Sequence, residues 1–139
     1  MSIKILYLED ELGMKHGLIN SLKKEGYIVD IAPNVVDAYA LLIENQNAKG
    51  YDLIIIDIYM DAKFLGKKHK LYEDRGGLCI LLELEEHNIN INKIVFSAWE
   101  DEDVKRITNE KHIKYILKSE ITNDDGRFQV IEEIKKIKK

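Results

Sequence analysis

Residues 51–60 read YDLIIIDIYM, and the rest of the chain can be understood around this stretch. Its apolar run, Leu53–Ile56, is shorter than a typical helix, and we interpret it as a strand buried on both faces. Such strands belong to parallel sheets that helices cover on each side. The run ends at Asp57, and ligands of open α/β sheets bind at this carboxyl edge of the strands. A carboxylate there can also simply begin a turn, so other parts of the chain must decide between the two roles.

The composition is that of a soluble globular protein. The 139 residues fit one domain, 45% of them are hydrophobic and 33% are charged. The net charge of −4 argues weakly against direct binding of nucleic acid. No apolar run is long enough to span a membrane, and the N-terminus shows no signal-peptide pattern. A single cysteine, Cys79, excludes an internal disulfide and fits a reducing compartment. We therefore expect a cytoplasmic protein without membrane attachment.

Strand and helix patterns alternate along the whole chain. Gly26 is placed to end a first helix, and Asn34 is a good N-cap for a second. The acidic run 100–103 suits the start of a fourth helix, because the helix dipole favours negative charge there. We expect strands at residues 3–8, 27–31, 53–56, 93–96 and 113–117. Five strands alternating with five helices predict an α/β fold, a doubly wound five-stranded parallel sheet of order 2-1-3-4-5 (flavodoxin-like), as a single domain over residues 1–139.

Polar side chains follow four of the predicted strands. Glu9 and Asp10 come after the first, Asp57 after the third, Ser97 after the fourth, and Lys118 ends the fifth. These strands are neighbours in the predicted order, so the side chains should converge at one edge of the sheet. Crowded carboxylates repel one another, and a hard divalent cation such as Mg²⁺ relieves that repulsion. A lysine and a hydroxyl beside them are what a transferred phosphoryl group needs.

The chain resembles the receiver domain of two-component response regulators over essentially its full length. The matching pieces are ILYLEDE, YDLIIIDIYM, GGLCILLELE, IVFSAWED and YILKSE, in the order of that family. The resemblance implies the receiver fold, no enzymatic activity beyond self-phosphorylation and self-dephosphorylation, and a requirement for Mg²⁺ or Mn²⁺. It also implies a role for each matching residue: phosphoacceptor, Asp57; metal ligands, Glu9, Asp10, Asp57 and the backbone carbonyl of Tyr59; phosphoryl-binding and switch residues, Ser97, Lys118 and Tyr115.

The chain departs from the family pattern in three places. Ser119 follows Lys118 where the family usually has proline, and a non-proline cis bond costs roughly 3 kcal/mol, so this bond is either trans or strained. Asp61 follows Met60, where the family's usual proline is absent. The segment 61–77 is longer than in the family and rich in lysine. It is either a solvated loop or a docking arm for an acidic partner, with Phe64, Leu65 and Tyr72 as anchors.

We expect a stand-alone phosphoacceptor that a histidine kinase or a histidine phosphotransfer protein phosphorylates. Its output would come from a change in the face that an unknown downstream protein, or a second copy in a homodimer, binds. A phosphorylation-independent interaction module is the alternative. A haloacid-dehalogenase-type phosphatase fits less well, because it needs a second aspartate two residues after its nucleophile. That position holds Tyr59.

Two large aromatic residues occupy the positions that influence how fast receivers lose their phosphoryl group. These are Tyr59 and Trp99, two residues after Asp57 and two after Ser97. Neither ring can orient an attacking water, and two rings over the opening would exclude it. We therefore expect slow self-dephosphorylation. The alternative is that Trp99 packs against the fourth helix and Tyr59 points to solvent.

Overall fold

The computed structural model describes residues 2–9, 16–45, 47–62, 72, 74–98, 100–118 and 127–137. Within these ranges strands and helices alternate as expected. The strands are β1 (Lys4–Leu8), β2 (Ile28–Ala32), β3 (Leu53–Ile56), β4 (Asn92–Ser97) and β5 (Lys114–Leu117). The helices are α1 (His16–Lys24), α2 (Val35–Tyr39), α3 (Gly76–Glu86), α4 (Glu102–Glu110) and α5 (Arg127–Lys135).

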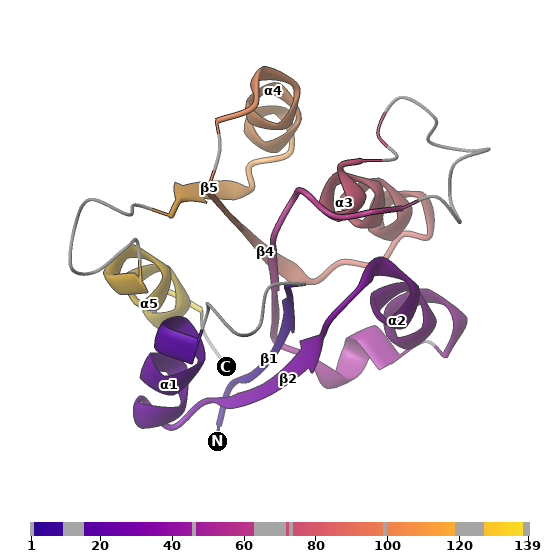
Figure 1. Ribbon diagram of the computed structural model, residues 1–139. Coiled ribbons are helices and arrows are strands. Elements are labelled where there is room, and N and C mark those ends of the chain that lie inside the picture. Colours follow the sequence, from indigo (N-terminus) through magenta and orange to yellow (C-terminus); the bar gives the residue numbers. More distant parts are fainter. Residues whose placement is uncertain are drawn as a thin grey trace.

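The strands form one parallel sheet in the order β2-β1-β3-β4-β5. In Figure 1, α1 and α5 lie together on one side of the sheet, and α2 and α3 lie on the other. The predicted fold class and strand order are therefore confirmed. None of the described helices is both long and apolar enough to span a membrane.

The central strands are buried on both faces, as the apolar run predicted. Successive side chains of β3 alternate between two cores: Ile54 and Ile56 pack toward α2 and α3, whereas Leu53 and Ile55 pack toward α1 and α5. All four are at most 1% exposed. Burial on both faces leaves polar groups room only at the ends of the strands. We therefore expect functional side chains at the ends of the strands.

The second helical segment differs from a simple α-helix. Asn34 caps α2 as expected, accepting a hydrogen bond from the backbone N–H of Asp37 at 2.7 Å. The helix then continues as a π-helix, η2 (Ala40–Glu44), and a short 3₁₀ helix, η3 (Asn47–Gly50), precedes β3. Apolar periodicity does not distinguish a π turn from an α turn, because Leu42 points to the core in either.

The register of the sheet brings the predicted strand-end residues to the same level. Leu8 of β1 is paired with Ile56 of β3, so the next residues, Glu9 and Asp57, lie side by side. On the other flank Ser97 is paired with Leu117, directly before Lys118. Backbone hydrogen bonds extend this pairing beyond the strands, from Asp57 N–H to the Leu8 carbonyl at 3.0 Å and from Lys118 N–H to the Ser97 carbonyl at 2.8 Å.

Two glycines allow α3 to begin directly against the backbone that carries Asp57. The N–H of Gly77 donates to the Ile58 carbonyl at 3.0 Å, and that of Gly76 to the Met60 carbonyl at 2.8 Å. A Cβ on Gly77 would lie 2.0 Å from the Asp57 carbonyl oxygen. Only glycine permits this approach without moving the backbone of the site.

Gly77→Ala should therefore destabilise the protein by about 1–3 kcal/mol or more, since the added methyl group meets backbone rather than a movable side chain. Chemical denaturation measures this change. Gly50→Ala is the matched control, because a Cβ there meets nothing within 4 Å. Equal midpoints for the two variants would show that α3 does not press on the Asp57 segment.

Candidate phosphoacceptor site

Two carboxylates share one ammonium group at the carboxyl edge of the sheet. The Nζ atom of Lys118 lies 2.7 Å from Oε2 of Glu9 and 3.5 Å from Oδ2 of Asp57. The other oxygen of Asp57, Oδ1, accepts a hydrogen bond from the N–H of Ile58 at 2.8 Å. The structure thus brings together three of the residues that the sequence predicted at this edge.

The three charged side chains are almost fully removed from water. The Glu9 side chain is 0% exposed, that of Lys118 is 6% and that of Asp57 is 12%. The Lys118 ammonium also lies 5.2 Å from the centre of the Phe96 ring, a cation–π contact that helps to hold it. Asp57 keeps the largest exposed fraction of the three, so it is the carboxylate that a reactant from solvent can reach.

The pKa of Asp57 is raised to about 7, mainly because the carboxylate is buried; the neighbouring Glu9 contributes to the rise, and Lys118 opposes it. Removing a carboxylate from water penalises its charged form, and one lysine offsets that penalty only in part. Two carboxylates thus share one ammonium group in a site that is shielded from water.

Ser97 and Tyr115 also meet at this edge. Ser97 is 0% exposed at the end of β4, and Tyr115 is half-buried on the adjacent β5. The Tyr115 hydroxyl forms hydrogen bonds with the Ser97 side chain and with the backbone N–H of Asp101, while burial raises its pKa. The two predicted switch residues are thus in contact with each other.

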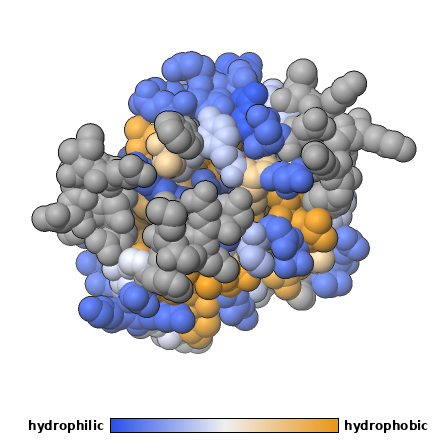
Figure 2. Space-filling model, in the orientation of Figure 1, coloured by the Kyte–Doolittle hydropathy of each residue, from blue (hydrophilic) through white to orange (hydrophobic). Residues whose placement is uncertain are grey.

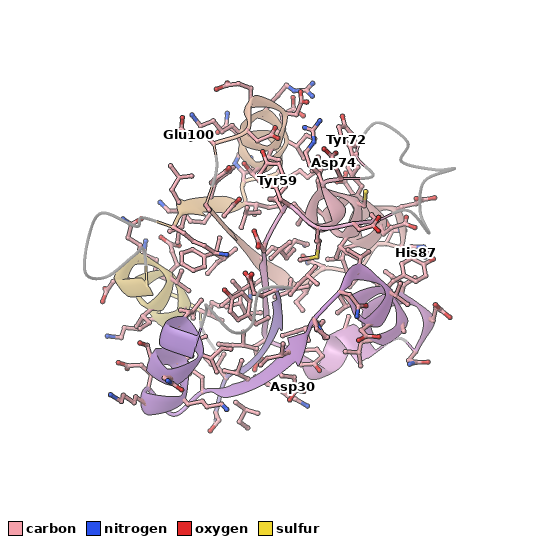
Figure 3. The ribbon with its side chains drawn as sticks, in the orientation of Figure 1. Asp30, Tyr59, Tyr72, Asp74, His87 and Glu100 are labelled. Atoms are coloured by element: carbon pink, nitrogen blue, oxygen red, sulfur yellow. The ribbon has the colours of Figure 1, made fainter. Side chains whose placement is uncertain are left out.

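Tyr59 does not simply point to solvent. Its hydroxyl donates to Oδ2 of Asp101 at 2.8 Å, and burial together with this hydrogen bond raises the Tyr59 pKa to about 12. Arg75 pairs with the same carboxylate, Nη1 to Oδ2, at 3.1 Å. In Figure 3, Tyr59 lies between α3 and α4. Sequence reasoning missed Arg75, because it lies in the irregular part of the chain, and took Asp101 only as a charge at a helix start.

Several predicted site residues lie outside the described residues. These are Asp10, Trp99, Ser119, and Phe64 and Leu65 of the long segment. The third proposed anchor, Tyr72, is half-buried, with its ring centre 5.2 Å from the Arg75 guanidinium carbon. In the described part of the chain, no three His, Cys, Asp or Glu side chains form a cluster suited to a metal. The predicted metal site therefore depends on Asp10, whose role stays a prediction.

The described residues nevertheless fit a divalent cation. Glu9 and Asp57 offer hard oxygen ligands, and these two carboxylates share the single ammonium group of Lys118. The carbonyls of Ile58 and Met60 accept hydrogen bonds from α3, whereas no residue of the described ranges donates to the Tyr59 carbonyl. That carbonyl is the backbone ligand predicted for the metal.

In a comparison with known families, the family described as response regulator receiver domain matches residues 5–125 of the chain. Among curated proteins, no significant match was found.

Solved structures share the fold. The CheY-like receiver domain protein of Methanospirillum hungatei JF-1 is 19% identical, with a TM-score of 0.70 over 97% of this chain and 92% of its own. The response regulator TrrA of Thermotoga maritima, solved with Mg²⁺-BeF, is 24% identical, with a TM-score of 0.69 over 98% and 99%. The phosphorylated cyanobacterial phytochrome response regulator RcpA is 23% identical, with a TM-score of 0.71 over 97% and 92%.

The raised pKa of Asp57 predicts a pH dependence of stability in metal-free buffer. The folded protein has an Asp57 pKa of about 7, whereas an unfolded chain has a value of about 3.9. Between these values the folded state binds more protons, so the free energy of unfolding falls as pH rises, by at most about 1.4 kcal/mol per pH unit.

Asp57→Asn lacks this titration and should gain stability relative to wild type as pH rises from about 4 to about 7, with a constant difference above that range. Urea denaturation of both proteins in the presence of a chelator measures the difference. Parallel pH profiles for the two proteins would contradict the raised pKa.

Proposed function

Because this chain belongs to the response regulator receiver domain family, we propose that Asp57 accepts a phosphoryl group from a histidine kinase or a histidine phosphotransfer protein. The observation that carries the proposal is the arrangement at the sheet edge. Asp57 is the most exposed member of a buried cluster in which Lys118 contacts both Asp57 and Glu9.

The chemistry is a displacement at phosphorus. A carboxylate oxygen of Asp57 attacks the phosphorus of the donor phosphohistidine as the P–N bond breaks, and the electron pair stays on the imidazole nitrogen. The product is an aspartyl phosphate. Lys118 lies where it can neutralise phosphoryl oxygens, and the buried site strengthens that attraction. Because the nucleophile must be ionised, positive charge near Asp57 favours the reaction.

A bound Mg²⁺ or Mn²⁺ would supply the remaining positive charge and hold phosphoryl oxygens. The residues proposed to bind it are Glu9, Asp10, Asp57 and the Tyr59 carbonyl. Glu9 contacts Lys118 at 2.7 Å, and we propose that its second carboxylate oxygen is the one that would face the metal.

The proposed output is a rearrangement at Ser97 and Tyr115. A phosphoryl group on Asp57 offers Ser97 a strong acceptor, which competes with its contact to Tyr115. Tyr115 lies on β5 beside α4, and Leu117 of the same strand is 37% exposed. Figure 2 shows hydrophilic residues gathered over α4 at the top of the view. We propose that a protein partner reads the change on this face.

Acetyl phosphate with Mg²⁺ should add one phosphoryl group to the wild-type protein and none to Asp57→Asn, as intact mass spectrometry would detect. The amide of asparagine is not a nucleophile, although it preserves the shape of the side chain. A wild type that stays unmodified while a control receiver is labelled would support the phosphorylation-independent interaction module instead.

Mg²⁺ should raise the melting temperature, because it binds the folded site and not the unfolded chain. At free Mg²⁺ about ten times its dissociation constant, the stabilisation is about 1.4 kcal/mol. Asp10→Asn should weaken this response while raising metal-free stability, since one of three crowded charges is removed.

Asp74→Asn is the matched control for that measurement, because the Asp74 side chain is 79% exposed and pairs with Arg75 rather than with Lys118. It should respond to Mg²⁺ as wild type does. A melting temperature of wild type that does not change with Mg²⁺ would count against the metal site.

A further inference from the structure

One carboxylate joins the starts of two helices to the segment that follows Asp57. Oδ2 of Asp101 accepts hydrogen bonds from the Tyr59 hydroxyl at 2.8 Å and from Nη1 of Arg75 at 3.1 Å. Oδ1 accepts from the backbone N–H groups of Asp103 at 2.9 Å and Val104 at 3.1 Å. The side chain is only 12% exposed. The two oxygens therefore have separate tasks, because Oδ1 caps α4 and Oδ2 holds Tyr59.

Arg75 is the second side chain that holds the Asp101 carboxylate, since its Nη1 contacts both carboxylate oxygens. Its Nη1 also lies 3.0 Å from Oδ2 of Asp103, and its guanidinium lies over the ring of Tyr72. Since α3 begins directly after Arg75, these contacts tie the start of α3 to the start of α4. A helix cap alone needs neither Arg75 nor a tyrosine hydroxyl. The extra partners indicate a role beyond capping.

Asp101 and Tyr59 lie in the two segments that follow the strands next to the proposed phosphoacceptor. Asp57 directly follows β3, and Ser97 ends the adjacent strand β4. Tyr59 lies in the segment after β3, and Asp101 lies in the segment after β4. The Tyr59 side chain thus bridges the two segments that border the Asp57 edge. The backbone N–H of Asp101 also binds the Tyr115 hydroxyl, which contacts Ser97.

We propose that Asp101 is a positioning residue that holds the Tyr59 ring at the opening above Asp57 and thereby prolongs the life of the phosphorylated protein. This inference rests on the proposed function. In hydrolysis, a water oxygen attacks phosphorus opposite the aspartyl oxygen, the P–O bond to Asp57 breaks, and the carboxylate keeps the electron pair. The water gives its proton to solvent, and inorganic phosphate leaves. A ring held by its hydroxyl restricts the approach of that water.

Asp101→Ser separates the two tasks, because a serine hydroxyl caps a helix well but offers no second oxygen to Tyr59. Tyr59→Phe removes only the hydroxyl and keeps both the ring and the backbone carbonyl. Each variant should lose its phosphoryl group roughly two- to tenfold faster than wild type, the change in population that one hydrogen bond supports. The double variant should be no faster than the faster single variant, because both changes break the same bond.

Asp101→Asn should lose its phosphoryl group as slowly as wild type does, since the asparagine side chain still caps α4 and still hydrogen-bonds to the tyrosine hydroxyl. Asp103→Ala is the matched control: it removes an Arg75 partner of equal charge, leaves the Tyr59–Asp101 bond intact, and should decay as wild type does.

The experiment labels each full-length protein with acetyl phosphate and Mg²⁺, removes the donor, and follows phosphoryl loss by intact mass beside a thermal melt. If Asp101→Ser and Tyr59→Phe both lose the phosphoryl group at the wild-type rate, the inference is overturned and the proposed function stands. Faster decay only in variants with lowered melting temperatures also overturns it, because loosened structure would then explain the rate. A wild type that takes up no label overturns the proposed function and the inference with it.

Discussion

The site depends on the two ion pairs that the Lys118 ammonium group forms. This group lies between Glu9 and Asp57, in a region where all three side chains are largely shielded from water. Without it, two buried carboxylates would face each other uncompensated, an arrangement that proteins avoid by protonation or by unfolding. With it, one ammonium group still faces two carboxylates, and burial keeps the pKa of Asp57 raised to about 7. Such an arrangement favours the binding of further positive charge, such as a metal ion.

The fold produces this arrangement through register and burial. Because the central strands are covered on both faces, polar side chains accumulate where those strands end. Pairing of Leu8 with Ile56 then sets Glu9 beside Asp57, although the two residues are far apart in sequence. Gly77 allows the start of α3 to press against the Asp57 backbone, so its carboxylate projects from a rigid base. The segment that carries the Asp57 carboxylate is thus held by backbone contacts to β1 and α3.

Much of this could be predicted from the sequence, since the relevant signals are local. The apolar run before Asp57 indicated a doubly buried strand, and the alternation of elements indicated the order of the sheet. The contacts of Asp101 could not be predicted in the same way. Its acidic neighbours signalled a helix start, which α4 confirms, but the tyrosine that it binds lies 42 positions away. Arg75 stood in a segment without periodicity, so nothing in the sequence indicated its partners. The π-helical end of the second helix was missed because the core-facing positions are the same for both helix types.

The central claim is that Asp57 itself becomes the acyl phosphate. Borohydride reduces an aspartyl phosphate to homoserine and leaves free aspartate unchanged, so it marks the modified residue. After treatment with acetyl phosphate and Mg²⁺, followed by borohydride, peptide mass spectrometry should find homoserine at position 57 and at no other aspartate. Homoserine at Asp10 or elsewhere, or its absence from a protein that carries a phosphoryl group, would contradict the account.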